Sequence, residues 1–261
     1  MQLQFSKYHG TGNDFIMIDN REMLLQRDNV ALYRQLCHRH FGIGADGVIL
    51  LQNLEGADFE MVYFNADGRE STMCGNGGRC MVAFAIRCGM QKEQFYFKAI
   101  DGMHEAFVAD GKVHLKMQDV QIGARRDTAY ILDTGSPHYV RFSEEVSGMD
   151  VKTAGARIRH APEFAAAGIN VNFVEVLQGG LLVRTFERGV EDETLSCGTG
   201  VTAAALAFAD AQSLPEGEHA IAITTPGGEL EVRFRVEGPQ VFRDVWLVGP
   251  AVAVFDGTIT I

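Results

Sequence analysis

Two cysteines stand in closely similar surroundings far apart in the chain. Cys74 lies in Glu-Ser-Thr-Met-Cys-Gly-Asn-Gly and Cys197 in Glu-Thr-Leu-Ser-Cys-Gly-Thr-Gly. In both cases a run of small apolar residues follows, which predicts one helix beginning near Gly77 and another near Gly200. Glycine lets backbone N–H groups turn toward a ligand, and the N–H groups of a helix N-terminus carry partial positive charge. Each motif therefore predicts a place for a carboxylate with a thiolate beside it.

Such a pair of thiols suits the inversion of an α-carbon. Inversion needs a base on one face of the carbon and an acid on the other, and a cysteine with an ordinary pKa of about 8.5 can serve as either. One sulfur would be thiolate and the other thiol, with the roles exchanged in the reverse reaction, so the pair titrates as a unit. Without a pyridoxal electron sink, donors around the carboxylate must stabilise the carbanion-like transition state, and closure that excludes water would strengthen them.

An internal repeat relates the two cysteines. Three further pairs of matching segments precede the cysteine motifs, in the same order in both halves and separated by nearly the same number of residues. They pair Thr11-Gly12-Asn13 with Thr134-Gly135-Ser136, Gly42-Ile43 with Gly168-Ile169, and Phe64-Asn65 with Phe186-Glu187. We therefore expect two similar halves related by a pseudo-two-fold axis, with Cys74 and Cys197 facing each other across the cleft between them.

The elements expected around these motifs mix strands and helices irregularly. Four segments rich in β-branched and aromatic residues predict strands: Phe59–Phe64, Val113–Met117, Ile169–Leu177 and Leu181–Phe186. Together with the two helices they favour an α+β fold over a regular βαβ array. We expect the halves to span residues 1–120 and 121–249, with the boundary near residues 118–125. A final strand near Ala251–Phe255, within residues 250–261, is expected to return to the first half.

Composition restricts the class of protein. The chain has 261 residues and a net charge of −11, which argues against general binding to nucleic acid. No apolar run reaches the length of a membrane span, and the first residues lack the apolar stretch of a signal peptide, so we expect a cytoplasmic protein with no membrane partner.

The cysteine count points to thiols and not to a disulfide framework. There are five cysteines, an odd number, and none has the paired spacing of a zinc site, so we expect no metal. Cys37, Cys80 and Cys88 are interpreted as small buried apolar residues, the latter two inside the first helix.

At these motifs the chain resembles the diaminopimelate epimerase family. The resemblance runs through His9-Gly-Thr-Gly-Asn13-Asp-Phe15, Gly42-Ile-Gly-Ala-Asp46-Gly47, Phe64-Asn65-Ala-Asp-Gly68, Met73-Cys74-Gly-Asn76-Gly77, Gly135-Ser-Pro-His138, Glu187-Arg188-Gly189 and Cys197-Gly-Thr199-Gly200. It covers residues 8–205, about three quarters of the chain. Two positions depart from the family pattern, since many members have Asn where Ser136 stands and some have Gln where Gly47 stands.

The resemblance implies two similar domains, each with a barrel-like sheet wrapped around a central helix. It implies that Cys74 and Cys197 are the acid/base pair, supported and tuned by His138 and Glu187. The residues implied to hold the reacting carboxylate are Gly75, Asn76, Gly198 and Thr199, and those implied to contact the rest of the substrate are Asn13, Asn65, Asn170 and Arg188. The family converts LL-diaminopimelate to the meso form without a cofactor, for lysine and peptidoglycan synthesis, and its members are homodimers.

Several site residues also have a purely structural interpretation. Asn13 and Asn65 are typical turn residues, and His138 after a proline is compatible with a hydrogen-bonded structural histidine. Glu187 and Arg188 are compatible with a solvated surface pair. The functional interpretation of these residues depends on the whole constellation.

Three competing functions remain open on the sequence alone. A racemase acting on another amino acid, such as histidine, would share both cysteines and the carboxylate site. A phenazine-type isomerase would replace a catalytic cysteine, which this chain does not. A binding protein without catalytic activity would have no use for two equivalent thiols.

Overall fold

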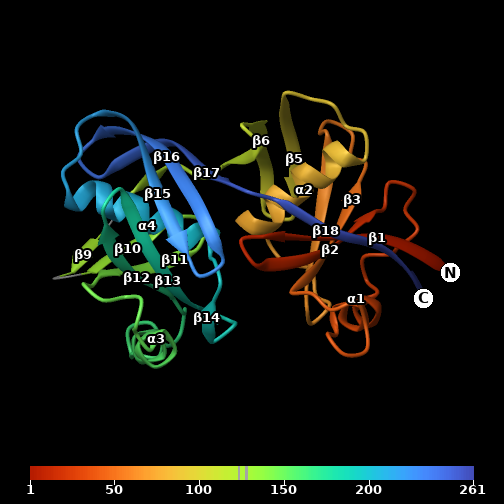
Figure 1. The fold of residues 1–261 in the computed structure, drawn as a ribbon, viewed down its shortest axis with the longest axis horizontal. Coiled ribbons are helices and arrows are strands. Elements are labelled where there is room, and N and C mark those ends of the chain that lie inside the picture. The colour runs from red at the N-terminus through yellow and green to blue at the C-terminus, as the bar shows by residue number, and fades with distance from the viewer. Residues whose placement is uncertain (123, 127–128) are drawn as a thin grey trace. The chain divides into compact units, whose positions relative to one another are not determined.

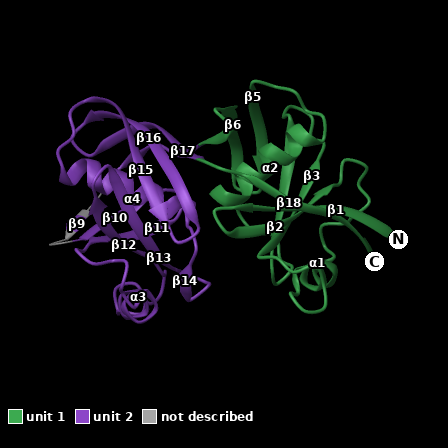
Figure 2. Cartoon of the chain, viewed as in Figure 1, with its two compact units in different colours: residues 1–115, 249–261 green, residues 116–248 purple. Residues whose placement is uncertain are grey.

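The computed structural model describes residues 1–122, 124–126 and 129–261, which form two compact units (Figure 2). Unit 1 comprises Met1–Leu115 together with Gly249–Ile261, and unit 2 comprises Lys116–Val248. Residue 123, inside the stretch where the sequence predicts a boundary, lies outside the described residues. Each unit is described below by itself.

Unit 1 is built from strands and two helices (Figure 1). Its elements are β1 (Gln2–Gly10), β2 (Asn13–Asp19), α1 (Val30–Cys37), β3 (Gly47–Gln52), β4 (Phe59–Asn65), α2 (Gly75–Arg87), β5 (Gln94–Ala99), β6 (Gly102–Ala109), β7 (Lys112–Lys116) and β18 (Val252–Thr260).

Unit 2 contains its own strands and two further helices. Its elements are β8 (Val120–Gln121), β9 (Ala124–Arg126), β10 (Ala129–Asp133), β11 (Pro137–Phe142), α3 (Val151–Arg159), β12 (Asn170–Leu177), β13 (Gly180–Glu187), β14 (Asp192–Thr194), α4 (Gly198–Ala211), β15 (Gly217–Thr225), β16 (Gly228–Gly238) and β17 (Val241–Gly249).

The two units have the same topology, which confirms the internal repeat. In unit 1, β1–β2 is antiparallel, β2–β3 parallel, β3–β4 antiparallel, β4–β5 parallel, and β5–β6–β7 antiparallel. In unit 2 the same alternation runs through β10–β11, β11–β12, β12–β13, β13–β15 and β15–β16–β17. One helix, α1 or α3, precedes the third strand of the series, and the other, α2 or α4, precedes the fifth.

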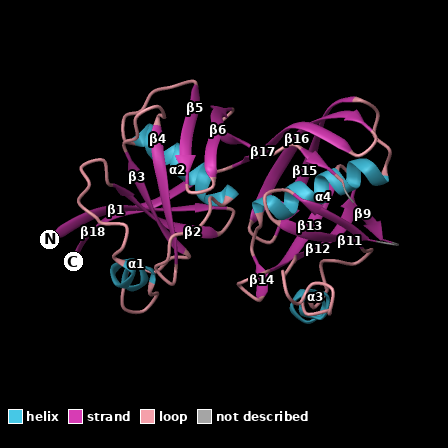
Figure 3. Cartoon of the chain, turned by 180° about the vertical axis from the view of Figure 1, so that it is seen from behind, coloured by secondary structure: helices cyan, strands magenta, loops and turns pink. Residues whose placement is uncertain are grey.

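In each unit the longer helix is enclosed by strands, as Figure 3 shows from behind. Helix α2 contacts β1, β2, β3, β4 and β6, and α4 contacts β10, β11, β12, β13, β15 and β16. Alanine dominates α4, and Ala203, Ala205 and Ala207 are all fully buried. A helix enclosed on most sides must be apolar nearly all round, and small side chains let the strands come close. The expected α+β fold with a sheet around a central helix is confirmed.

Matching tight turns place the first site residues in each unit. Thr11 and Gly12 both have positive φ, 47° and 86°, in the turn that leads into β2 at Asn13. Gly135, with φ of 103°, occupies the equivalent turn between β10 and β11, next to Ser136. Because glycine adopts such backbone angles without steric cost, both hairpins can turn tightly beside the helix N-termini.

The structure differs from the sequence-based expectation at the end of α2. The sequence predicts Cys88 as a buried residue inside the helix, but the helix ends at Arg87, and Cys88 is its half-buried C-cap. Gly89 follows with φ of 94°, the left-handed conformation that commonly terminates helices. Cys37 and Cys80 are buried, as expected. No helix within the described part of the chain is both long and apolar enough to cross a membrane.

Candidate active site

Cys74 is the N-cap of α2 and is half-buried. Its Sγ accepts a hydrogen bond of 3.1 Å from the Gly77 backbone N–H, so the sulfur stands where a serine or aspartate oxygen usually caps a helix. The N–H donor and the positive end of the helix both favour a negative charge on this sulfur. The expectation that a helix N-terminus lies at this cysteine is therefore met.

Two asparagine amides lie beside Cys74. Asn13 Oδ1 is 3.8 Å from Cys74 Sγ and accepts a hydrogen bond of 3.3 Å from Asn76 Nδ2. The orientation of the Asn13 amide is set from its other side, because Asn13 Nδ2 donates to Asp46 Oδ2 at 2.7 Å. Asp46 in turn accepts from the guanidinium of Arg39. Unit 1 thus brings Cys74, Asn13 and Asn76 together.

Asp14, the residue after Asn13, forms ion pairs with two basic side chains. Asp14 pairs with Lys7 at 2.7 Å and with Arg39 at 2.9 Å. Burial of Asp14 opposes its ionisation, but the hydrogen bonds and charges of Arg39 and Lys7 outweigh burial and lower its pKa to about 2. Lys7 and Asp14 lie on the neighbouring strands β1 and β2, so the pair ties the two strands of the hairpin together.

Asn65 is more exposed than Asn13 and Asn76, the other two expected site asparagines of unit 1. It is exposed at the end of β4, directly opposite Gly47 of β3. A Cβ at Gly47 would lie 2.5 Å from the Tyr63 ring and 2.6 Å from Phe64 O, so this chain has no room there for a larger residue. The glycine at this departure from the family pattern is therefore required by the packing of β4.

Cys197 is the N-cap of α4 and is buried, with 7% of its surface exposed. Unlike Cys74, its side chain makes no capping hydrogen bond to the helix. Its Sγ lies 3.5 Å from Thr199 Oγ1, which belongs to the first turn of α4. The two equivalent cysteines therefore sit at equivalent helix ends but have different hydrogen-bond partners.

His138 reaches Cys197 through Thr199. The imidazole is fully buried on β11, and its Nε2 is 2.9 Å from Thr199 Oγ1. On the other side of the ring, Nδ1 is 3.0 Å from Asn172 Nδ2. Asn170 Nδ2, at 3.5 Å from Nε2, donates instead to a serine hydroxyl.

The surroundings of Asn172 determine which nitrogen of His138 carries the proton. Asn172 Oδ1 accepts from Thr185 Oγ1 at 2.9 Å, and Asn172 Nδ2 donates to the Tyr139 carbonyl at 3.2 Å. A carbonyl only accepts, so the amide nitrogen must face both Tyr139 O and His138 Nδ1. Nδ1 is therefore an acceptor, and the neutral ring carries its proton on Nε2, which donates to Thr199 Oγ1.

This arrangement keeps His138 uncharged. Burial lowers its pKa to about 3, and the positive charge of Arg188 acts in the same direction. At neutral pH His138 thus donates a hydrogen bond to Thr199, whose own hydroxyl proton can then point to Cys197 Sγ. In this geometry His138 can orient the Thr199 hydroxyl, while its acceptor nitrogen, Nδ1, faces Asn172 and not the thiol.

Asn170, Arg188 and Ser136 form a second polar cluster in unit 2. Asn170 Nδ2 donates to Ser136 Oγ at 3.2 Å, and Asn170 Oδ1 accepts from the Arg188 backbone N–H at 2.9 Å. The exposed guanidinium of Arg188 reaches Ser136 Oγ at 3.4 Å and the Ala167 carbonyl at 3.1 Å. The serine at this departure from the family pattern accepts hydrogen bonds from both neighbours.

The remaining expected site residues occupy ends of elements. Glu187 is half-buried at the end of β13, opposite Asp192 of β14. Gly75 and Gly198 are the first residues of α2 and α4, and both are buried. In the part of the chain that the structure describes, no three His, Cys, Asp or Glu side chains gather as a metal ion would require.

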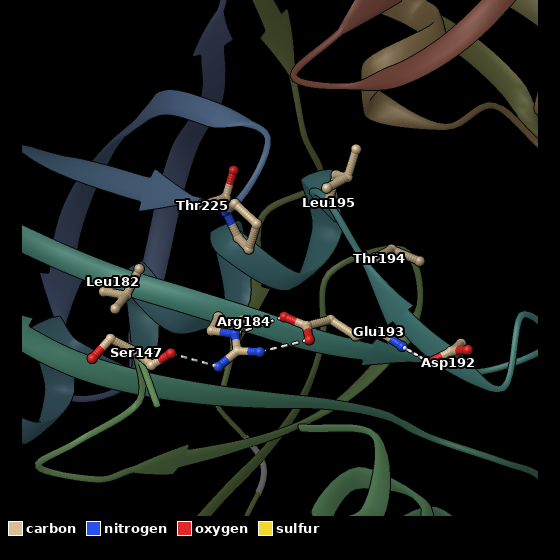
Figure 4. Close-up of a pocket in the computed structure, with 9 residues that line it drawn as sticks. Ser147, Leu182, Arg184, Asp192, Glu193, Thr194, Leu195 and Thr225 are labelled. Carbon is tan, nitrogen blue, oxygen red and sulfur yellow. Dashed lines mark hydrogen bonds and ion pairs between the residues drawn. The ribbon is translucent and has the colours of Figure 1, made fainter. Parts of the chain in front are cut away.

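A cavity of about 650 Å³ in unit 2 is lined by none of the expected site residues (Figure 4). Its polar centre is Arg184, which makes a bidentate ion pair with Glu193 at 2.7 Å and also donates to three backbone carbonyls. All three nitrogens of this guanidinium donate to acceptors within the protein. Arg184 therefore braces β14, the strand that leads toward Cys197, and offers little to a ligand.

Two buried residues beside the expected site residues are not predicted from the sequence: Asn172 and Arg79. Arg79 lies in α2 and donates to Asn76 Oδ1 at 2.8 Å. A signal for Asn172 exists, because it stands two residues after Asn170 in a strand and so shares its face. For Arg79 there is no such signal, since an arginine in a helix ordinarily faces water.

Comparison with known proteins agrees with these features. The family model for diaminopimelate epimerase matches residues 5–122 and 130–254. The diaminopimelate epimerase of Flavobacterium psychrophilum is 48% identical over 259 residues, which cover 98% of this chain and 100% of the relative. That of Chlorobaculum tepidum is 43% identical, covering 97% of this chain and 99% of the relative.

Solved structures share the fold. A phenazine biosynthesis protein of the PhzF family from Bacillus anthracis is similar with a TM-score of 0.78 and 15% identity, covering 100% of both chains. A hydroxyproline epimerase from Agrobacterium vitis, solved with trans-4-hydroxy-L-proline, gives 0.71 and 15% identity, covering 99% of this chain and 91% of the other. At such identities the likeness concerns the fold alone. The matched family and the close relatives decide the rest: this chain belongs to the diaminopimelate epimerase family.

Proposed function

We propose that this protein is an isomerase that inverts one α-carbon of LL-2,6-diaminopimelate, giving meso-diaminopimelate, with Cys74 and Cys197 as the acid/base pair. The observation that carries the proposal is the duplication itself: equivalent helices of two units with one topology each begin at a cysteine. Membership of the family supplies the substrate.

In the proposed mechanism the two half-sites lie on opposite faces of the same carbon. The backbone N–H groups at the starts of α2 and α4, from Gly75, Asn76, Gly198 and Thr199, bind the carboxylate next to that carbon. The thiolate on one face removes the α-proton while the thiol on the other face delivers its own. Negative charge grows on the bound carboxylate during this step, and the helix N-termini stabilise it where it develops.

In the proposed mechanism the two thiols have different hydrogen-bond partners. The Gly77 N–H donates directly to Cys74 Sγ, whereas Thr199 stands between Cys197 and neutral His138. Thr199 can turn its hydroxyl proton toward a Cys197 thiolate or accept from a Cys197 thiol, so it serves both directions of the reaction. Glu187 is proposed to tune this side of the site.

The far end of the substrate carries a second carboxylate and ammonium group. We assign their recognition to Asn13, Asn65, Asn170 and Arg188, of which Arg188 offers a planar fork that matches a carboxylate. This assignment is supported by two hydrogen bonds of Arg188, from its backbone N–H to Asn170 Oδ1 and from its guanidinium to Ser136 Oγ. A homodimer and a cytoplasmic location stay predictions that follow from the family resemblance and the composition.

The function is tested by hydrogen exchange at the α-carbon in heavy water, with LL-, meso- and DD-diaminopimelate and with histidine. We expect exchange and epimerisation with the LL and meso isomers only, and loss of epimerisation in both Cys74→Ala and Cys197→Ala. Near-normal turnover by either variant would contradict the two-base mechanism. Preferred turnover of histidine would instead leave the chemistry intact and favour the racemase alternative.

Oxidation tests the placement of the two sulfurs. If both flank one carbon, closure without substrate brings them near enough to form a disulfide. A peptide map of oxidised enzyme should then contain a Cys74–Cys197 crosslink that substrate prevents and a reductant removes. Oxidation that never yields this crosslink would contradict the opposed arrangement.

A further inference from the structure

Arg79 is a buried cation in the interior of unit 1. Its side chain is fully enclosed, with 0% of its surface exposed, although arginine is among the residues least often buried without an ionic partner. None of the ion pairs formed by the described residues includes Arg79. Taking a guanidinium out of water without a counter-ion is costly, so this residue calls for a physical explanation.

The guanidinium joins three separate segments around Cys74. It donates to Gly75 O at 3.2 Å and to Asn76 Oδ1 at 2.8 Å, both in the first turn of α2. It also donates to Thr11 Oγ1 at 3.4 Å, in the turn before β2, and to the Pro250 carbonyl at 3.3 Å. One side chain therefore fixes the helix start, the neighbouring hairpin and the segment that leads into β18.

The contact with Asn76 determines how that amide is turned. Because Asn76 Oδ1 accepts from Arg79, Asn76 Nδ2 is directed to Asn13 Oδ1 at 3.3 Å. Asn13 Oδ1 is the oxygen that lies 3.8 Å from Cys74 Sγ. Arg79 thus acts on the reacting sulfur through two amides, each held in one orientation.

Among the described residues, the groups whose charge can balance Arg79 are two cysteines. Burial lowers the pKa of Arg79 to about 10, which still leaves it charged at neutral pH, and the groups whose charges act on it are Cys80 and Cys74. Burial raises the pKa of Cys80 to about 12, so Cys80 stays a neutral thiol. The other sulfur, Cys74 Sγ, stands at the N-terminus of α2 and accepts a hydrogen bond from the Gly77 N–H, a position that favours a negative charge.

The other ionisable groups on strands packed against α2 have partners of their own. The pairs are Lys7 with Asp14, Asp19 with Arg21, Glu60 with Arg27, His104 with Asp101, and Glu105 with Gln94, while His9 accepts from the Gly12 N–H and Tyr8 lies near Arg87. None of them is among the groups that act on Arg79.

We propose that Arg79 is a positioning residue for Cys74: its buried guanidinium favours the thiolate form of that cysteine and locks the Asn76 and Asn13 amides beside it. The charge contribution concerns Cys74 alone and holds for any reaction at this sulfur. The contribution to turnover rests on the proposed function.

The test measures the ionisation of Cys74 directly. The rate of alkylation of Cys74 by iodoacetamide is followed against pH by peptide mass spectrometry, in a Cys197→Ala background and without substrate. Arg79→Gln keeps a hydrogen-bond donor but removes the charge. Its inflection should move upward by about one pH unit, which means roughly tenfold less thiolate at a given pH below it. Arg87→Met, at an exposed position of the same helix, should leave the inflection unchanged.

Arg79→Lys separates the two contributions. A lysine keeps the charge but lacks the fork that reaches both Thr11 and Asn76, so the inflection should stay near that of the parent while turnover in the Cys197-containing enzyme falls about tenfold. This variant also decides the question if the neutral variant does not fold. The proposal is overturned if the pH inflection of Cys74 alkylation in folded Arg79→Gln equals that of the parent. It is also overturned if the inflection in Arg79→Lys moves as far as in Arg79→Gln. Failure of the wild-type enzyme to epimerise diaminopimelate would refute the proposed substrate without altering the alkylation result.

Discussion

The neutral state assigned to His138 predicts a specific dependence of stability on pH. In the folded protein its pKa is about 3, whereas an unfolded chain has an ordinary histidine pKa of about 6.5. Between these values the unfolded chain binds a proton that the folded protein does not. The contribution of His138 to stability is therefore complete above pH 6.5 and is lost progressively as the pH falls toward 3.

The size of this loss follows from the two pKa values. The free energy of unfolding changes by about 1.4 kcal/mol for each pH unit across the window where only the unfolded state is protonated. From pH 7.5 to pH 4.5 the contribution of His138 falls by about 2.7 kcal/mol. His138→Gln removes the titrating group and keeps a polar side chain, so its stability should fall by that much less over the same range.

Trp246 makes the measurement selective. It is the one tryptophan in the sequence and lies in β17, within unit 2, the unit that contains His138. Urea unfolding followed by its fluorescence, at several pH values, therefore reports on the relevant unit. Carboxylates contribute equally to both proteins, so the difference between wild type and His138→Gln isolates the histidine.

Nuclear magnetic resonance gives a second readout. The nitrogen shifts of His138 should show a proton on Nε2 and no titration between pH 5 and pH 8. A resonance that titrates near pH 6.5, a proton on Nδ1, or equal acid losses in the two proteins would each refute the assignment. The role of His138 as a neutral donor to Thr199 would then have to be abandoned.

Two further substitutions probe the geometry of unit 2. Gly200→Ala places a Cβ 2.4 Å from Asn172 Oδ1, and the Asn172 amide is held in place by hydrogen bonds to Thr185 and Tyr139. We therefore expect kcat/KM to fall about ten- to a hundredfold. The control Gly148→Ala, whose Cβ would have no atom within 4 Å, should leave kcat/KM nearly unchanged. Arg188→Met should lower kcat/KM for LL-diaminopimelate roughly a hundredfold, and Arg188→Lys should recover only part, because an ammonium cannot make a bidentate contact. Steady-state assays with each variant check both; an unaffected Gly200→Ala or Arg188→Met enzyme would contradict the geometry.

The sequence alone predicts the features of this fold that repeat. Glycines and a small-residue run after each cysteine suffice to predict two helices, which begin at Gly75 and Gly198, two residues earlier than expected near Gly77 and Gly200. Each helix begins at the residue directly after its cysteine, which occupies the N-cap position. Local pattern therefore predicts the element and the neighbourhood of its first residue.

Features that depend on distant segments could not be predicted in this way. Whether Arg79 is buried is decided by Thr11 and Pro250, which lie far from it in the chain and close over it in space. The absence of room at Gly47 is likewise decided by Tyr63 on the neighbouring strand. Residue type and spacing carry no information about such contacts, so the sequence predicts both cysteines as site residues but does not predict a role for Arg79.

The pairing of β1 with β18 sets an order for folding during translation. Residues 116–248 leave the ribosome as one uninterrupted unit, but unit 1 needs residues 249–261, and β18 pairs along β1 from Gln2 to His9. At about 5–20 residues per second, the nascent β1 waits roughly ten to fifty seconds for this partner. A ribosome that stalls after unit 2 would therefore carry a chain with every proposed site residue present and a first unit that cannot close.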